Sequence, residues 1–291
     1  MVINSVKKLL QYTKANNCSI GEYMLMYEME HQQCSKEDVL NRMLYNWQVM
    51  KESIETGINN PQISKGGLIG GQGKQLLDYC QDHEMLSGKN VAEAVSYALA
   101  VAEVNATMGK IVACPTAGSC GIVPGVLYKL QQLLSLNDEQ IVYGLLTASG
   151  IGMIIATKAS VSGAVAGCQA ECGAAAAMAS AAAVELAGGT PEQAAEACAL
   201  VLKNILGLVC DPVAGLVEVP CAKRNAMGVS LALSMADMAR ADIKSVIPVD
   251  EVIDTMGNVG RSLPDTLRET ALGGLAMTPT GQALKRKIFG R

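Results

Sequence analysis

The scarcity of aromatic side chains limits the folds that this chain can adopt. Half of its 291 residues are apolar, yet Phe, Trp and Tyr together make up only 3%. Small aliphatic side chains must therefore fill the interior. A composition dominated by Ala, Gly, Val, Leu and Met favours helices that approach one another closely over two packed sheets.

Helical spacing recurs along the chain and predicts a mainly α fold. Ser35 is a candidate N-cap before acidic residues, and Thr190 is a second one with Pro191 and Gln193 in the expected positions. The helix after Ser35 carries an apolar stripe of Val39, Met43, Trp47 and Met50. Further helices are predicted over 6–14, 90–109, 126–136, 138–160, 172–189, 192–207, 224–242 and 249–264. We expect a single all-helical domain over 1–291, more polar over about 1–60, without strands or repeats.

Gly-rich segments separate the predicted helices and are the expected carriers of functional groups. They cover 60–74, 114–125, 162–173, 207–221 and 273–280. Glycine permits close approach of the backbone to a ligand. The first segment does not have the spacing of a P-loop, which argues against nucleotide binding.

Charge and hydropathy disfavour several classes of partner. The net charge of −4 provides no basic surface for a nucleic acid. The apolar region 144–184 is interrupted by Lys158 and Glu171, and no segment reaches about 18 uninterrupted apolar residues, so we expect no membrane partner. The first residues do not resemble a secretory signal. Ten cysteines then indicate a reducing, cytoplasmic location with free or metal-bound thiols.

Three cysteines stand out because each lies beside Gly or Pro in a turn-rich stretch. They are Cys168, Cys210 and Cys221, at intervals of 42 and 11 residues. Asp211-Pro212 follows the second and Pro220 precedes the third, so proline stiffens both ends of the loop between them. No local CxxC pair indicates a zinc ribbon. The set suggests a metal or an iron–sulfur cluster, and the alternative is three buried free thiols.

Several segments resemble the α chain of iron–sulfur-dependent L-serine dehydratases. They read CPTAGSCGIVPG, SVSGAVAGCQAE, NILGLVCDPVAGLVEVPCAKRNA and RETALGGLA, and the likeness covers most of residues 90–276. The resemblance implies a [4Fe-4S] cluster held by Cys168, Cys210 and Cys221, with one iron left open for L-serine. Some members carry a regulatory β domain ahead of the catalytic one. Its absence here implies a separate α subunit that works with a β subunit.

The same resemblance implies an amino-acid-degrading lyase that converts L-serine to pyruvate and ammonia. The open iron would act as a Lewis acid on the serine hydroxyl while a base removes the α-proton. Elimination would give aminoacrylate, which becomes an imine and hydrolyses. The competing interpretations are a cysteine desulfidase with a similar cluster, a pyridoxal-phosphate dehydratase with Lys158 as its Schiff base, and a non-catalytic iron–sulfur sensor.

Five residues are candidates for substrate binding. Thr116, Gly118 and Ser119 form a small-residue turn that could cradle a carboxylate, although an ordinary helix-capping turn would have the same sequence. Ser162 precedes Cys168 in the chain and could line the same pocket or merely permit a helix contact. Arg224 could pair with a carboxylate or balance the charge of the cluster.

The general base is the least determined element of this prediction. Lys158 lies in an apolar stretch and is the candidate catalytic residue of this chain. His31 and His83 lie in polar sequence typical of solvated side chains, which leaves a β subunit as the alternative source of the base. Asp211 and Glu171 are expected to orient hydrogen bonds around the ligands. Cys114 is the rival ligand.

Overall fold

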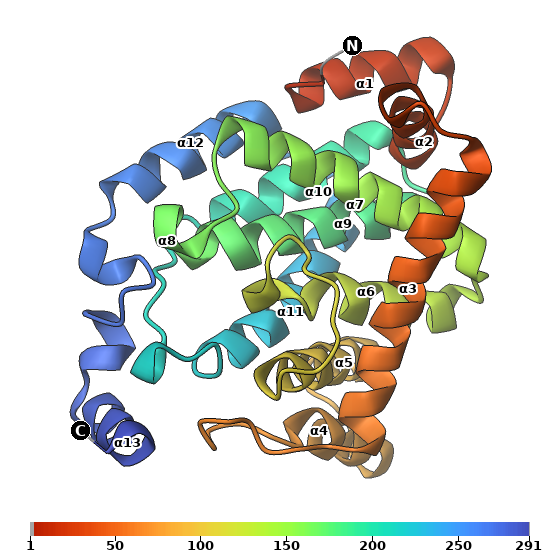
Figure 1. Ribbon diagram of the computed structural model, residues 1–291. Helices are drawn as coiled ribbons and strands as arrows, with labels where there is room; N and C mark the ends of the chain where they lie inside the picture. The colour runs from red at the N-terminus through yellow and green to blue at the C-terminus, as the bar shows by residue number, and fades with distance from the viewer. Residues whose placement is uncertain (1–2, 291) are drawn as a thin grey trace.

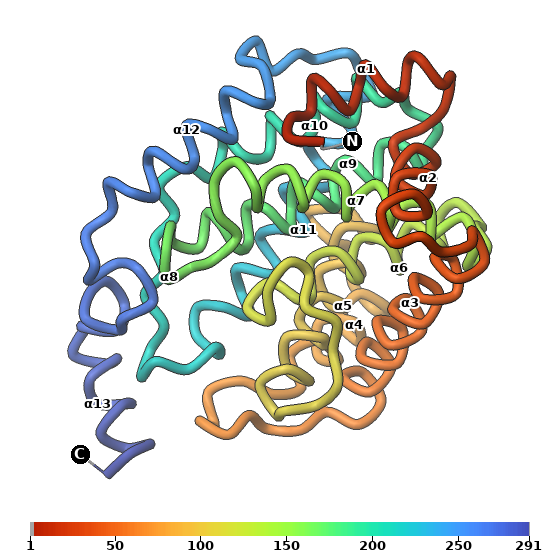
Figure 2. The backbone as a smooth tube through the Cα atoms, turned by 45° about the horizontal axis from the view of Figure 1, so that its top comes forward, coloured from red at the N-terminus to blue at the C-terminus, as the bar shows by residue number. Residues whose placement is uncertain are grey.

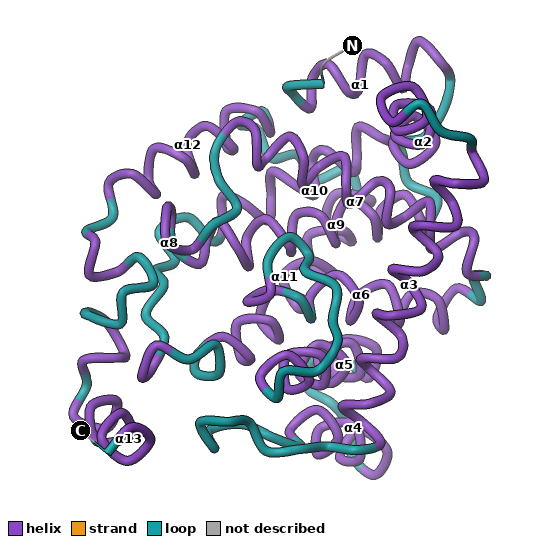
Figure 3. Tube along the Cα trace, viewed as in Figure 1, coloured by secondary structure: helices purple, strands orange, loops and turns teal. Residues whose placement is uncertain are grey.

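The computed structural model describes residues 3–290, and none of these residues forms a β-strand (Figure 3). The mainly α prediction is therefore confirmed. The first helices are α1 (Val6–Asn16), α2 (Ile20–Gln32), α3 (Lys36–Asn59), α4 (Gln72–Asp82) and α5 (Lys89–Ala106). The central helices are α6 (Ile122–Leu134), α7 (Asp138–Lys158), α8 (Gly163–Ala166), α9 (Ala174–Leu186), α10 (Pro191–Asn204) and α11 (Cys221–Arg240). The last are α12 (Val249–Ser262) and α13 (Pro279–Phe289).

Helix α9 lies at the centre of the core, surrounded by α6, α7, α10 and α11 (Figure 1). Every residue from 174 to 184 is buried, and most of them are alanines. Neighbouring helices approach closely because glycines face larger side chains. A Cβ atom on Gly152 of α7 would lie 2.8 Å from the sulfur of Met178. Small residues thus fill the interior, as the composition predicts.

Helix α7 is long and apolar enough to cross a membrane, judged by length and composition alone. In the structure it packs against α2, α3 and α9, and 67% of its most apolar window is buried inside the protein. Its hydrophobicity is thus that of a core helix.

The predicted helix starts are confirmed in detail. Ser35 and Thr190 each cap their helix in a reciprocal capping box, with Asp38 and Gln193 as the partners. Helices α2, α4, α8 and α13 lie outside the predicted helices, and α8 falls in the segment 162–173 that was expected to be irregular. The chain runs from α1 and α2 at one end to α13 at the opposite end, a separation seen in both views (Figures 1 and 2).

Asp138, the first residue of α7, joins three helices through its carboxylate. It accepts hydrogen bonds from Trp47 Nε1 at 2.9 Å, from Lys51 Nζ at 2.8 Å and from Gln131 Nε2 at 2.8 Å. Burial opposes ionisation of this carboxyl group, but the hydrogen bonds outweigh it and lower its pKa to about 2. The ionised carboxylate therefore stabilises the packing of α3 and α6 against α7.

Replacing Asp138 with Asn should destabilise the fold by about 1 kcal/mol at neutral pH, a value reduced for the partial exposure of the ion pair. Because the pKa of the folded state is the lower one, this stabilisation is complete above about pH 4 and is lost as the pH falls toward 2. Urea denaturation between pH 7 and pH 3 should show the two proteins converging at acid pH. A pH-independent difference, or an equal loss in an Asp78→Asn control at the exposed Lys74 pair, would contradict this.

Candidate active site

The three predicted cysteine ligands are all buried and come from three different elements. Cys168 directly precedes a π-helical turn at Gln169–Gly173, and Cys210 lies in the loop between α10 and α11. Cys221 is the first residue of α11. The prediction that Gly-rich loops carry all three is therefore corrected. Only Cys210 lies in a loop, whereas Cys221 belongs to α11 and Cys168 is followed directly by the π-helical turn. π-Helical turns occur frequently at functional sites.

The π-helical turn is tied to the loop that carries Cys210. Gly167 adopts φ +76°, and a Cβ atom there would lie 2.7 Å from the carbonyl oxygen of Leu208. The buried amide of Gln169 accepts a hydrogen bond from the Gly207 backbone N–H at 2.9 Å. These contacts require a glycine at position 167 and place Cys210 beside Cys168.

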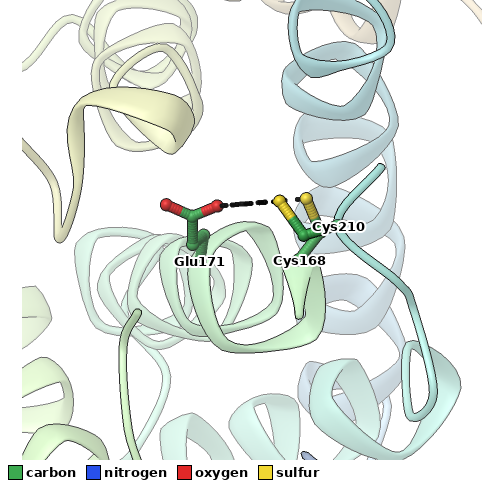
Figure 4. A group of neighbouring side chains, drawn as sticks. All are labelled: Cys168, Glu171 and Cys210. Carbon is green, nitrogen blue, oxygen red and sulfur yellow. Dashed lines mark hydrogen bonds between the residues drawn. The ribbon is translucent and has the colours of Figure 1, made fainter. Parts of the chain in front are cut away.

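Glu171 completes a compact group with Cys168 and Cys210. The two sulfur atoms and one carboxylate oxygen all lie within 4.8 Å of one another. Figure 4 shows the carboxylate pointing from the π-helical turn toward both thiols; its Oε2 lies 3.9 Å from Cys168 Sγ and 4.0 Å from Cys210 Sγ. Burial, reinforced by the charge of Cys168, raises the pKa of Glu171 to about 7. From the sequence alone, only a supporting role is expected for this residue.

The predicted substrate turn meets this group. Thr116 Oγ1 donates a hydrogen bond to Glu171 Oε1 at 2.9 Å and lies 3.2 Å from Ser119 Oγ. A Cβ atom on Gly118 would lie 3.2 Å from Glu171 Oε1, and one on Gly163 would lie 2.5 Å from Oε2. Ser162 immediately precedes Gly163 and is the N-cap of α8. The turn 116–119 and the segment 162–163 therefore flank the carboxylate from two sides.

Arg224 is held in contacts with its own chain. Its Nη1 donates to Cys168 Sγ at 3.3 Å and to the Val209 carbonyl at 2.8 Å, and Nη2 donates to Asp211 Oδ1 at 2.8 Å. The Arg224 side chain is 12% exposed. Of the two predicted roles for this residue, this geometry supports the balancing of negative charge at Cys168.

The surroundings shift the pKa values of the three thiols in different directions. Hydrogen bonds with Cys172 and Cys210, aided by Arg224, lower the pKa of Cys168 to about 3. Hydrogen bonding with this thiolate, together with burial, raises the pKa of Cys210, and burial with the charge of Cys168 raises that of Cys221 to about 12. Metal binding to the protonated thiols would therefore release protons.

The candidate bases of this chain have other contacts. Lys158 Nζ lies 3.1 Å from Asp254 Oδ1 on α12, in an ion pair between α7 and α12. His31 and His83 are exposed and stack on tyrosine rings, with ring centroids 3.8 Å and 3.9 Å apart. The exposure of both histidines agrees with their polar sequence surroundings.

Asn225 is a positioning residue to which the sequence analysis assigned no role. Its Oδ1 accepts from Gly121 N at 2.9 Å, while Nδ2 donates to the carbonyls of Gly118 at 2.8 Å and Cys221 at 2.9 Å. The residue is 1% exposed. It fixes the predicted substrate turn to the start of α11, and its position directly after Arg224 was the available signal.

The Gly-rich segment before α4 binds a carboxylate of its own chain. Buried Glu218 accepts from Ser64 Oγ at 2.6 Å, from Gly66 N at 2.7 Å and from Leu68 N at 3.2 Å. Glu218 belongs to the loop between Cys210 and Cys221. This contact places the Gly-rich segment against the loop that carries the cysteines.

Comparison with known proteins is decisive for the family. The family model described as serine dehydratase alpha chain matches residues 15–276, which include all three cysteines. The chain belongs to this family.

Individual relatives of this serine dehydratase α chain agree with the family match. It is 52% identical over 289 residues to the "Probable L-serine dehydratase, alpha chain" of Bacillus subtilis (strain 168), covering 99% of this chain and 96% of that protein. The "L-serine dehydratase, alpha chain" of Peptoniphilus asaccharolyticus is 40% identical, with 99% of each chain covered. "L-serine dehydratase TdcG" of Escherichia coli (strain K12) is 38% identical over 94% of this chain, which covers 61% of that longer protein.

Proposed function

We propose that this serine dehydratase α chain, acting as one catalytic domain, converts L-serine to pyruvate and ammonia with a [4Fe-4S] cluster and a β subunit. The observation that carries the proposal is the buried meeting of Cys168, Glu171 and Cys210 within a sequence that matches the family. Cys221 is proposed as the third ligand. The names of the relatives support L-serine as the substrate. The ten free cysteines support a reducing cytoplasm as the setting.

The donor chemistry of the residues present fits such a cluster. Thiolates are the usual ligands of iron–sulfur centres, and three of them leave one iron of a [4Fe-4S] cluster open. Cys168, Cys210 and Cys221 are buried, and Arg224 already neutralises part of the thiolate charge. Gly163 lacks the Cβ atom that would lie 3.2 Å from Cys210 Sγ, so the backbone leaves space beside the thiols.

The chain's own residues would bind and orient the substrate. When bound, the cluster supplies a Lewis acid for the charge that develops on the departing hydroxyl oxygen. The Thr116 hydroxyl and the turn 116–119 provide donors for the serine carboxylate, and Gly118 leaves room for it. Glu171 provides the anionic group that suits the substrate ammonium. Burial of this group of side chains excludes water and strengthens each electrostatic contact.

We assign the general base to the β subunit. The exposure of His31 and His83 and the pairing of Lys158 with Asp254 support this assignment. The α chain reconstituted anaerobically with iron and sulfide should contain the cluster but form little pyruvate from L-serine until the β subunit is added. Full activity of the α chain alone would overturn the assignment of the base. An absence of iron and sulfide would overturn the cluster.

Two further measurements separate the competing functions. Formation of sulfide from L-cysteine without pyruvate from L-serine would favour a cysteine desulfidase. A cluster spectrum that changes on addition of L-serine, with no turnover in the complete α–β complex, would favour a sensor.

A further inference from the structure

The group of Cys168, Glu171 and Cys210 has the dimensions of a site for one metal ion. Metal–sulfur bonds of about 2.3 Å and metal–oxygen bonds of about 2.1 Å in a tetrahedral arrangement hold sulfur and oxygen about 3.6 Å apart. Glu171 Oε2 lies 3.9 Å from one sulfur and 4.0 Å from the other. All three donor atoms lie within 4.8 Å of one another, so small side-chain shifts would bring them onto a single ion.

A cluster makes a different demand on the same cysteines. Its three thiolates bind three separate irons, whereas two thiolates on one ion must lie side by side. Cys221, the third proposed cluster ligand, is outside the compact group, and Glu171 takes the third position instead. The side chains are therefore arranged for a single ion, and cluster insertion would require the two close thiols to separate.

The carboxylate is positioned as a ligand. Thr116 holds its Oε1 by a hydrogen bond of 2.9 Å, which leaves Oε2 directed at the thiols (Figure 4). Outer contacts of this kind orient ligands in metal sites. Gly163 leaves the space beside Oε2 open, because a Cβ atom there would lie 2.5 Å from that oxygen. Two thiolates and one carboxylate suit divalent iron, zinc or cobalt better than magnesium or calcium.

We propose that Cys168, Glu171 and Cys210 bind one Fe²⁺ ion without Cys221, and that this mononuclear state precedes cluster assembly. Binding forms two iron–sulfur bonds and one iron–oxygen bond and releases to solvent the protons that the ligands carry, that of the Cys210 thiol among them. The iron remains divalent, so no electron donor or acceptor is needed. The inference rests on the proposed function only for the choice of iron as the physiological metal.

Cobalt is a suitable probe because Co²⁺ bound to thiolates gives a charge-transfer absorption that grows with the number of sulfur ligands. The full chain, purified anaerobically without iron, should bind one equivalent of Co²⁺ with such an absorption. Glu171→Gln should keep the two-thiolate absorption but weaken binding by at least about ten-fold, the lower end of the effect of losing a supporting contact. Cys210→Ala should lose one of the two sulfur contributions.

Cys221→Ala is the matched variant that separates an ion site from a cluster site. It should bind Co²⁺ like the unsubstituted chain and yet fail to assemble a cluster. Loss of Co²⁺ binding in Cys221→Ala, or unchanged affinity in Glu171→Gln, would overturn the inference. Cys172→Ala should also bind Co²⁺ like the unsubstituted chain. Cys172 hydrogen-bonds with Cys168 and is the competing sulfur donor, so loss of Co²⁺ binding in this variant would overturn the inference as well.

Folding of each variant is measured separately from metal binding. Failure of the proposed function can also be distinguished from failure of this inference. Zn²⁺ should raise the thermal unfolding temperature of the unsubstituted chain and of Cys221→Ala but not of Cys168→Ala, because an ion that binds only the folded state stabilises it. Circular dichroism shows whether each variant is folded. Normal Co²⁺ binding without cluster or pyruvate would refute only the proposed function, whereas cluster and pyruvate formation with Co²⁺ bound independently of Glu171 would refute only this inference.

Discussion

Alanine at Cys168, Cys210 or Cys221 should eliminate the iron–sulfur cluster and lower pyruvate formation by at least about 10³-fold. A metal acting as a Lewis acid contributes several kcal/mol of transition-state stabilisation, and each 1.36 kcal/mol is about a factor of ten in rate. A cluster that already has one open iron cannot lose a further thiolate without becoming labile. Iron and acid-labile sulfide, measured anaerobically after reconstitution, should fall in all three variants together with activity in the presence of the β subunit.

Cys198→Ala provides the control. This cysteine is fully buried in α10 and belongs to the main core, and burial raises the pKa of its thiol. The variant should retain its iron and its activity while losing about 1 kcal/mol of stability, a typical cost for a core substitution. A normal iron and sulfide content in any of the three site variants would show that the corresponding cysteine is not a ligand.

The helices were predictable because their signals are local. Ser35 and Thr190 mark helix starts by hydrogen bonds that span only three residues, so the sequence alone contains both partners of each cap. The abundance of Ala and Gly likewise predicts close helix packing, and α9 shows it. Helix α13 is not evident from the sequence because its Thr278 cap and Pro279 lie within the Gly-rich segment 273–280, whose composition indicates irregular backbone.

The site was predictable only in part because its geometry depends on contacts between distant segments. Cys168 and Cys210 are brought together by the tie between Gln169 and Gly207, which no local pattern encodes. Glu171 becomes a member of the group only because a π-helical turn directs it toward the thiols. The residue type suggested a supporting role, whereas the tertiary structure gives the carboxylate a position equivalent to that of a ligand.

The role of Arg224 also depends on contacts between distant segments. Its sequence position allowed either substrate binding or charge balance, and the choice depends on what its guanidinium group meets. Asp211 and the carbonyl of Val209 hold that group against the Cys168 sulfur. Asp211 in turn accepts a hydrogen bond of 2.8 Å from the backbone N–H of Leu275. The ion pair therefore joins the cysteine loop, α11 and the segment before α13.

Asp211→Ala should destabilise the iron-free chain by about 3–5 kcal/mol, the usual cost of removing one partner from a buried ion pair. The Asp211 side chain is 4% exposed, so the substitution would leave the guanidinium charge of Arg224 partly unpaired in the interior. It would also remove the acceptor of the Leu275 N–H. Asp211→Asn should cost less, because its amide oxygen can still accept from that N–H. Urea denaturation under reducing conditions measures both effects.

Asp254→Ala tests whether burial of the ion pair causes the large loss of stability expected for Asp211→Ala. Asp254 also pairs with a cation, Lys158, but its side chain is 54% exposed, and exposed pairs contribute about 0–1 kcal/mol. If burial determines the cost, Asp211→Ala should lower the free energy of unfolding several times more than Asp254→Ala. Equal losses at the two positions would mean that the Asp211–Arg224 pair is as well solvated as the exposed one. In that case Arg224 would not be held firmly enough to fix the charge at Cys168.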